Sequence, residues 1–214
     1  MAIDAFEKLP EEKREMIITA GIREFAGQSY RDVKTDVIVG RCGISKGILF
    51  HYFGSKKGFY LYCLDTALRR LTEMTPPPEG NDFYEVLFAE MKQKMDVCRR
   101  YSDEMHIVNM ASRDASVEIA EDKAALLGKY MTAVHAASAK TLKRAMSFLT
   151  LKATGKPKVT AEALHVYITA ILNLYLTQYQ QDPDRFFSQE KRIQKEMKEY
   201  LDMMLYGICT QEEV

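Results

Sequence analysis

The sequence lacks several features by which whole classes of protein are recognised. Its 30 basic and 30 acidic residues cancel, so the chain as a whole carries no net charge to attract nucleic acid. Its four cysteines show no metal-ligand or redox spacing, and each lies among apolar residues in the sequence. We therefore expect reduced, buried thiols, with no bound metal and no other cofactor.

Long apolar segments are also missing. Residues 1–15 contain no apolar stretch of the secretory-signal type. The most apolar segment, residues 161–176, is interrupted by Glu162, His165 and Asn173, which makes it too short and too polar to span a bilayer. We therefore expect a cytoplasmic protein without a membrane partner.

Enzyme motifs and strand patterns are the third absence. The sequence has no nucleophile motif, no glycine-rich phosphate loop, no paired catalytic carboxylates and no zinc spacing. No segment alternates apolar and polar residues as a half-buried strand does, whereas apolar residues at helical spacing occur almost throughout. These patterns predict a non-enzymatic, all-α protein.

Three consecutive prolines at 76–78 are the only strong break in the chain. They predict a boundary between a first domain over residues 1–55, followed by a connecting helix at about 56–74, and a helical domain over 76–214. Within the later domain, apolar spacing predicts helices over about 82–98, 102–111, 116–152, 160–180 and 184–209.

The first domain contains the pattern of a helix-turn-helix. Its first helix is expected to begin at Pro10, and the next two to begin at Thr35 and after Ser45, both suited to capping a helix. Gly43 suits the left-handed backbone of the tight turn between the last two helices, and Gly54 ends the third. The predicted shared core consists of Ile38, Val39, Ile44, Leu49 and Phe53.

The other face of the third helix carries residues suited to a major groove. Lys46 can bond guanine O6 or N7, and Phe50 can contact a thymine methyl group. The helix starts at Thr35 and Lys56 favour a phosphate, and Lys34 adds charge. The predicted DNA contacts are Lys34, Thr35, Ser45, Lys46, Gly47, Phe50, His51, Tyr52 and Lys56.

Residues 31–57 hold six basic and two acidic residues, a local net charge of +4. Such a patch suits a DNA backbone, although charge alone also fits an ordinary solvated face.

The stretch Ile44-Ser-Lys-Gly-Ile-Leu-Phe-His-Tyr-Phe-Gly-Ser-Lys-Lys57 resembles the signature of the TetR family of bacterial transcriptional regulators. The resemblance extends over residues 10–65 through Ile17, Ala20, Phe25, Tyr30, Ile38 and Gly43. It implies a homodimer that binds palindromic double-stranded operator DNA and responds to a small-molecule effector, more often as a repressor than as an activator. It also implies dimerisation through the last two helices.

The sequence departs from the family pattern at several positions. Ser29 replaces a usual glycine, Gly21 and Gly40 lie inside helices where alanine or a polar residue is usual, Ile48 replaces a small or hydroxyl residue, and Phe50 replaces a frequent tyrosine.

Residues 82–180 are rich in methionine and aromatic side chains, which suit a pocket for a mostly apolar effector. The alternative is that these side chains fill the core. His106, His135 and His165 are either polar anchors or satisfied core histidines. The candidate effector residues are Phe88, Met91, Met95, Met110, Tyr130, His135, Tyr167 and Tyr175.

The segment 160–180 is apolar on nearly all sides, and 184–209 carries an apolar stripe. So much apolar surface predicts burial against a second subunit, although burial within one chain remains the alternative. The predicted dimer residues are Leu164, Ile171, Tyr175, Met197, Leu201, Met204 and Leu205.

Two other functions compete with DNA regulation. An enzyme would need a catalytic motif, which the sequence does not contain. A helical interaction protein whose helix-turn-helix no longer binds DNA would leave Lys46, Phe50, His51 and Tyr52 unexplained. Steeply salt-dependent DNA binding would separate the regulator from this last alternative.

Overall fold

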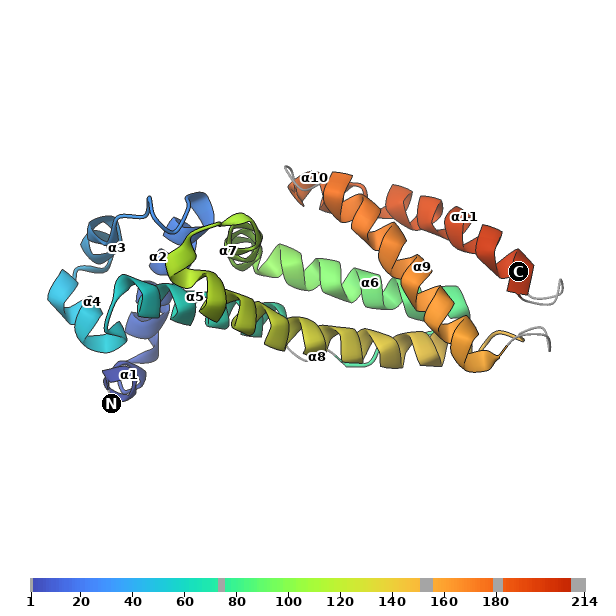
Figure 1. Cartoon of the computed structure of the whole chain (residues 1–214), viewed down its shortest axis with the longest axis horizontal. Helices are drawn as coiled ribbons and strands as arrows, with labels where there is room; N and C mark the ends of the chain where they lie inside the picture. The colour runs from blue at the N-terminus through green and yellow to red at the C-terminus, as the bar shows by residue number, and fades with distance from the viewer. Residues whose placement is uncertain (1, 73–75, 151–155, 179–182, 209–214) are drawn as a thin grey trace. The chain divides into compact units, whose positions relative to one another are not determined.

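The computed structural model describes residues 2–72, 76–150, 156–178 and 183–208. All regular structure in these ranges is helical (Figure 1), which confirms the predicted all-α fold. The helices are α1 (Ala2–Glu7), α2 (Glu11–Gly27), α3 (Thr35–Cys42), α4 (Lys46–Phe53), α5 (Lys56–Leu71), α6 (Phe83–Arg100), α7 (Ser102–Arg113), the 3-10 turn η1 (Val117–Ile119), α8 (Ala120–Met146), α9 (Pro157–Gln178), α10 (Pro183–Ser188) and α11 (Glu190–Ile208).

The chain forms two compact units. The first consists of Met1–Met74 with Val97–Val134, and the second consists of Thr75–Asp96 with His135–Val214. The first unit therefore contains α7 and the beginning of α8 in addition to the predicted DNA-binding helices. Compactness does not test which residues bind DNA or ligand, so the functional division at residues 55 and 76 remains a prediction.

The core of the first unit lies where α2, α5 and α7 meet. Gly21 on α2 explains how closely two of these helices approach. A Cβ atom added at Gly21 would lie 2.5 Å from Cζ of Phe59 and 2.6 Å from Sγ of Cys63, both on α5. Only a hydrogen fits there, which accounts for a glycine inside a helix at the cost of some helix propensity.

The second unit has its own core, formed by apolar side chains of α6, α8, α9 and α11. Two tyrosines of α9 form hydrogen bonds with α11. The hydroxyl of Tyr167 donates to the carbonyl of Tyr200 at 3.0 Å, and that of Tyr175 donates to Glu196 at 2.9 Å. Burial and the Glu196 carboxylate raise the pKa of Tyr175, so its hydroxyl stays protonated and remains a donor. No helix among the described residues is long and apolar enough to cross a membrane.

The observed helices differ from the predicted ones at three places. α1 precedes the expected first helix and was not predicted. The helix expected over 116–152 starts as the 3-10 turn η1, because the Asp114 carboxylate accepts the N–H of Ser116 at 2.8 Å, and α8 ends at Met146. The last predicted helix is divided into α10 and α11.

Candidate nucleic-acid interface

The turn between α3 and α4 has the geometry expected from its glycine and serine. Gly43 ends α3 with φ +60°, the left-handed region that favours glycine. Ser45 caps α4, and its Oγ accepts the N–H of Ile48 at 3.2 Å. Gly54, at φ +73°, ends α4 and donates to the carbonyl of Phe50 at 2.8 Å. The predicted helix-turn-helix therefore forms, with α4 as its second helix.

The inner face of this motif forms the small core that the apolar residues predicted. Ile38, Leu49 and Phe53 are buried together, and Ile44 packs partly buried against the same cluster. Because α4 is anchored through Leu49 and Phe53, its opposite face is turned toward solvent.

The outward face of α4 agrees with the prediction in part. Ser45, Lys46, Gly47 and His51 are exposed, whereas Phe50 and Tyr52 are half-buried against the core. Ile48 is 43% exposed and was not among the predicted contacts. An exposed isoleucine on the second helix of such a motif is an apolar group of the kind that contacts a thymine methyl. The sequence could have indicated this contact, because Ile48 directly follows Lys46 and Gly47, which were predicted to contact DNA.

Lys46 does not extend freely into solvent. Its Nζ lies 3.0 Å from Oδ2 of Asp36 on α3, and both side chains are well exposed. Arg41 is likewise paired, with Glu24 at 2.6 Å. Within the described chain, Arg31 and Lys34 are exposed and no acidic side chain pairs with either, so these two cations are free to meet phosphate.

Thr35 is a correction to the predicted contacts. The structure places Lys34 at the N-cap of α3, without a side-chain cap, and Thr35 as the first helical residue. The Thr35 side chain is buried, because it faces the interior of the first unit. A buried side chain cannot reach phosphate, so only the backbone at this helix start remains available.

Lys56 is a second partial correction. It is half-buried, its Nζ donates to the carbonyl of Arg31 at 3.1 Å, and it lies 4.9 Å from the ring centroid of Tyr30. Burial lowers the pKa of Lys56. These contacts give Lys56 a role in holding the segment before α3, which the sequence alone did not indicate.

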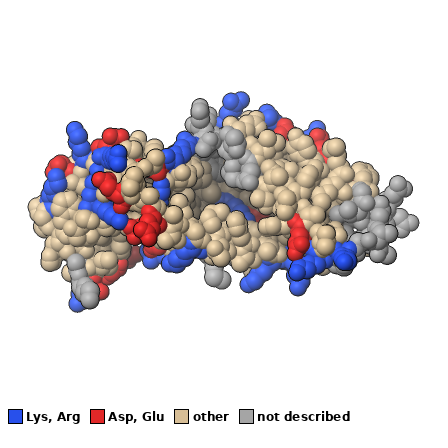
Figure 2. All heavy atoms as spheres, viewed as in Figure 1, with Lys and Arg blue, Asp and Glu red and all other residues tan. Residues whose placement is uncertain are grey.

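The surface around these helices mixes both signs of charge. On the face in view, Figure 2 shows Lys and Arg side by side with Asp and Glu over the N-terminal helices at the left. The local net charge of +4 already includes Asp36. It is reduced further by two acidic partners from outside residues 31–57, Glu24, which pairs with Arg41, and Asp122, which forms an ion pair with Lys57.

One comparison identifies the domain that holds the helix-turn-helix. Residues 17–63 match the sequence profile of the bacterial regulatory proteins, tetR family. This part of the chain is therefore a DNA-binding domain of the tetR-family type, which agrees with the expected DNA-binding regulator.

Solved structures share the fold over nearly the whole chain. A TetR-family regulator from Chloroflexus aurantiacus has a TM-score of 0.62 at 21% identity, over 97% of this chain and 98% of that one. One from Streptomyces coelicolor has a TM-score of 0.62 at 18% identity, over 92% and 84%. The fatty acid degradation regulator FadR from Bacillus halodurans has a TM-score of 0.61 at 14% identity, over 85% and 95%. A comparison with curated protein sequences finds no match.

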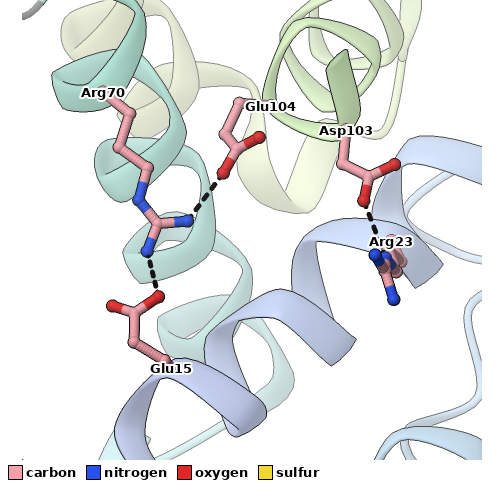
Figure 3. Close-up of polar contacts among 5 residues, drawn as sticks. All are labelled: Glu15, Arg23, Arg70, Asp103 and Glu104. Carbon is pink, nitrogen blue, oxygen red and sulfur yellow. Dashed lines mark hydrogen bonds and ion pairs between the residues drawn. The ribbon is translucent and has the colours of Figure 1, made fainter. Parts of the chain in front are cut away.

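Ion pairs fasten the TetR-type DNA-binding helices to α7 (Figure 3). Arg70 on α5 binds Glu15 on α2 at 2.5 Å and Glu104 on α7 at 2.6 Å, while Arg23 on α2 binds Asp103 on α7 at 2.7 Å. The side chains of Arg70 and Glu104 are only 20% and 10% exposed, so this pair is desolvated, whereas Arg23 and Asp103 are largely in water. Removing one partner of a desolvated pair is the costly change.

The predicted effector residues do not gather in one unit. Met110 and Tyr130 belong to the first unit, where the Tyr130 hydroxyl donates to Asp65 at 2.9 Å. The other six belong to the second: His135 is exposed, Phe88 and Tyr167 pack at the edge of the core, and Met91, Met95 and Tyr175 are buried in it. Their assignment to a pocket remains a prediction.

A depression of about 390 Å³ lies on the surface of the first unit. It is lined by Glu12, Glu15, Met16, Thr19, Ala20, Arg23 and Arg41, four of which carry a charge. An open depression bordered by charged side chains does not enclose a ligand as an effector pocket does. Among the described residues, no three His, Cys, Asp or Glu side chains are grouped to hold a metal ion.

The predicted dimer residues lie on α9 and α11, and most of them face the core of their own unit. Tyr175 on α9 and the other buried members pack into the core of their own unit, and Met204 is half-buried beside it. Side chains already covered by their own chain have no apolar surface left for a partner. The buried members are Leu164, Ile171, Tyr175, Met197, Leu201 and Leu205.

The solvent face of α9 carries a different apolar stripe, of Val159, Ala163, Val166, Ala170 and Leu174, all exposed. On α11, Tyr200, Met203 and Tyr206 are exposed as well. These side chains are spaced at three or four residues, and they form an exposed apolar surface on α9 and α11.

Proposed function

We propose that this chain is a homodimeric repressor that binds a palindromic operator in the cytoplasm and is released by a small, mostly apolar effector. The observation that carries the DNA-binding part is the outward face of α4. A recognition helix capped by Ser45 exposes Lys46, Gly47, Ile48 and His51 within a TetR-type domain. Exposed apolar and basic groups together on one short helix suit the edges of bases in a major groove.

The contacts divide into two roles. Lys46 and His51 donate to base edges, Gly47 lets the backbone approach, and Ile48 contacts a thymine methyl. Ser45 reaches the groove at the N-terminal end of α4, while Phe50 and Tyr52 contribute only the parts of their side chains that are not packed. Lys34, Arg31 and the backbone at the starts of α3 and α5 hold phosphate, which positions the domain without reading sequence.

The exposed apolar stripe on α9 supports a homodimer. A soluble helix that is apolar toward its own core and also toward solvent needs a second partner. A second copy supplies an identical stripe, as a two-fold interface requires, with α11 contributing Met203. Two recognition helices held about 34–36 Å apart then enter successive major grooves of a palindrome.

The effector is expected to be a small, mostly apolar molecule. The methionine and aromatic side chains of the second unit, led by Phe88, Met91 and Met95, support an apolar ligand. FadR, one of the structures that share the fold, is by name a fatty acid degradation regulator, which agrees with this chemistry. A ligand that prefers a dimer with a different spacing of its recognition helices releases the operator by that difference in affinity.

Selection of genomic DNA fragments by the purified protein, repeated across a salt series, tests this function. We expect enrichment of one imperfect palindrome and steep salt dependence. His51→Ala should relax the preference at one base position, costing about 1–3 kcal/mol, whereas Lys34→Ala should weaken all sequences alike and reduce the salt slope by about 1.

Equal effects of the two variants on operator and random DNA would refute the assigned roles. Absence of binding at every salt concentration, even after refolding to remove bound ligand, would favour a helical interaction protein instead.

A further inference from the structure

Helix α1 is an element that precedes the TetR-type domain and lies beside the recognition helix (Figure 1). Phe6 is its anchor and is only 1% exposed. The Phe6 ring lies 5.6 Å from that of Tyr52 and 4.8 Å from that of Phe53, both on α4, and 5.5 Å edge-on to Tyr62 on α5. One side chain therefore touches both the recognition helix and the helix that follows it.

Polar contacts at Glu7 hold α1 in this place. The Glu7 carboxylate pairs with Nη1 of Arg14 on α2 at 2.8 Å, and the Glu7 carbonyl accepts from the same nitrogen at 3.0 Å. The Tyr62 hydroxyl donates to the other carboxylate oxygen of Glu7. Burial and Glu7 raise the pKa of Tyr62, so the phenol remains a donor. α1 is thus tied to α2 and α5 while its aromatic face contacts α4.

The recognition helix depends on such outside contacts. α4 has eight residues, and only Leu49 and Phe53 are buried. A helix this short is marginal by itself, so its orientation is set by what it packs against. Tyr52 is half-buried, and its ring centroid lies 5.6 Å from that of Phe6 and 5.8 Å from that of His51. The Phe6 contact therefore determines where the C-terminal half of α4 places Tyr52 and His51.

We propose that Phe6 is a positioning residue for DNA recognition, which sets the orientation of Tyr52 and of the C-terminal half of α4 in the major groove. This role rests on the proposed function. Phe6 itself touches no DNA. It affects the sequence preference at the bases that this half of α4 reads. The phosphate contacts of Lys34 and Arg31, which precede α3, remain unchanged.

The test measures affinity for the selected operator and for a random duplex with the full-length protein. Phe6→Ala should lower operator affinity about tenfold and leave random-duplex affinity and the salt slope unchanged, because a good base contact is worth about this much. Phe6→Leu, which keeps the site apolar and the fold intact, should lower it about threefold in the same direction. Ile3→Ala, on the same helix but 49% exposed, is the matched control and should bind as the wild type does.

A double-mutant cycle separates positioning from simple stability. If Phe6 acts through Tyr52, Phe6→Ala should cause no further loss of operator preference in a Tyr52→Ala protein. Unchanged preference in both Phe6 variants, with only a lower melting temperature, would overturn the positioning role. Failure of the wild-type protein to enrich any operator would instead overturn the proposed function, and this role with it.

Discussion

The two units hold their helices together by different means. In the first, short helices are fixed by caps, by glycine at close crossings and by charged pairs such as Arg70 with Glu104. In the second, long helices pack along apolar faces, and tyrosine hydroxyls such as that of Tyr175 bind α11 from α9. Directional contacts fix one geometry, which suits the presentation of a single recognition helix.

An apolar helix face does not by itself determine which element packs against it. On α9 the inner face packs into the core, while the outer face, centred on Val166, stays exposed. The first unit is thus held by directional contacts within one chain, whereas the second leaves an apolar helix face exposed, which is where we propose the second copy to bind.

The largest effect is expected at the α9 stripe. Val166 is 67% exposed, and Val166→Glu would place two carboxylates in a two-fold interface. Burying unpaired charges costs several kcal/mol, so dimerisation should weaken at least ~100-fold and operator affinity should fall with it. Sedimentation velocity measures the change. Lys158→Ala, at an exposed position on the same helix, should leave the dimer intact. A Val166→Glu protein that stays dimeric would place the interface elsewhere.

The next largest effect is expected when Arg70 is removed. Arg70→Met leaves Glu104 with little solvent and no cation, which should cost about 2–4 kcal/mol of unfolding free energy in urea titrations. Arg23→Met breaks the exposed pair with Asp103 and should cost much less, because water screens both charges. The double variant Arg70→Met with Glu104→Gln should regain part of the loss. Equal losses from the two single variants would show that desolvation does not distinguish the pairs.

The amino-acid sequence predicts the helix-turn-helix well because its signals are local. Gly43, Ser45 and Gly54 each dictate a backbone conformation within a few residues, and the structure has all three. α1 escaped prediction because six residues make fewer than two helical turns and are too few to show a helical period. Its place is fixed by contacts with other helices, among them those of Phe6 with Tyr52 and Tyr62. α3 begins at Thr35 as predicted, but only the packed core shows that the Thr35 side chain turns inward and does not cap the helix.

The second unit is harder to predict from sequence. The apolar residues of α9 predict a buried helix correctly, but they occur on nearly every side. Which side meets the chain's own core depends on α6 and α11, which are far away in the sequence. The sequence prediction therefore named Leu164 and its neighbours, which the core buries, whereas Val166 is the side chain that stays exposed.

A smaller, pH-dependent effect is expected at Asp114. Its Oδ2 accepts the N–H of Tyr30 at 2.5 Å and its Oδ1 accepts that of Ser116 at 2.8 Å, joining the segments before α3 and after α7. Burial acts to raise the pKa of Asp114, but the hydrogen bonds from Ser116 and Tyr30 and the charge of Lys123 hold it below its ordinary value.

A carboxylate with a lowered pKa in the folded state stabilises the fold above its ordinary pKa and loses this contribution as the pH falls through the folded value. Asp114→Asn should therefore cost about 1–2 kcal/mol at pH 7, and the difference from the wild type should shrink below about pH 4. Melting temperatures from pH 7 to 3.5 test this, with the exposed Glu118→Gln as control. A difference that stays constant down to pH 3.5 would contradict an ionised acceptor.

The smallest effect is expected at Asp36, which is 71% exposed where it holds Lys46. Asp36→Asn should change stability by less than about 1 kcal/mol, because both groups are in water.

On DNA the same change frees Lys46 to meet any phosphate and removes a repelling charge, so random-duplex affinity should rise about threefold with a steeper salt slope. Operator affinity should rise less, because Lys46 already bonds a base in that complex. The ratio of operator affinity to random-duplex affinity should therefore fall. Asp32→Asn removes an equal charge one turn before α3 without touching Lys46. If it raises random binding just as much, net charge explains the result, and the Asp36 contact does not guide Lys46.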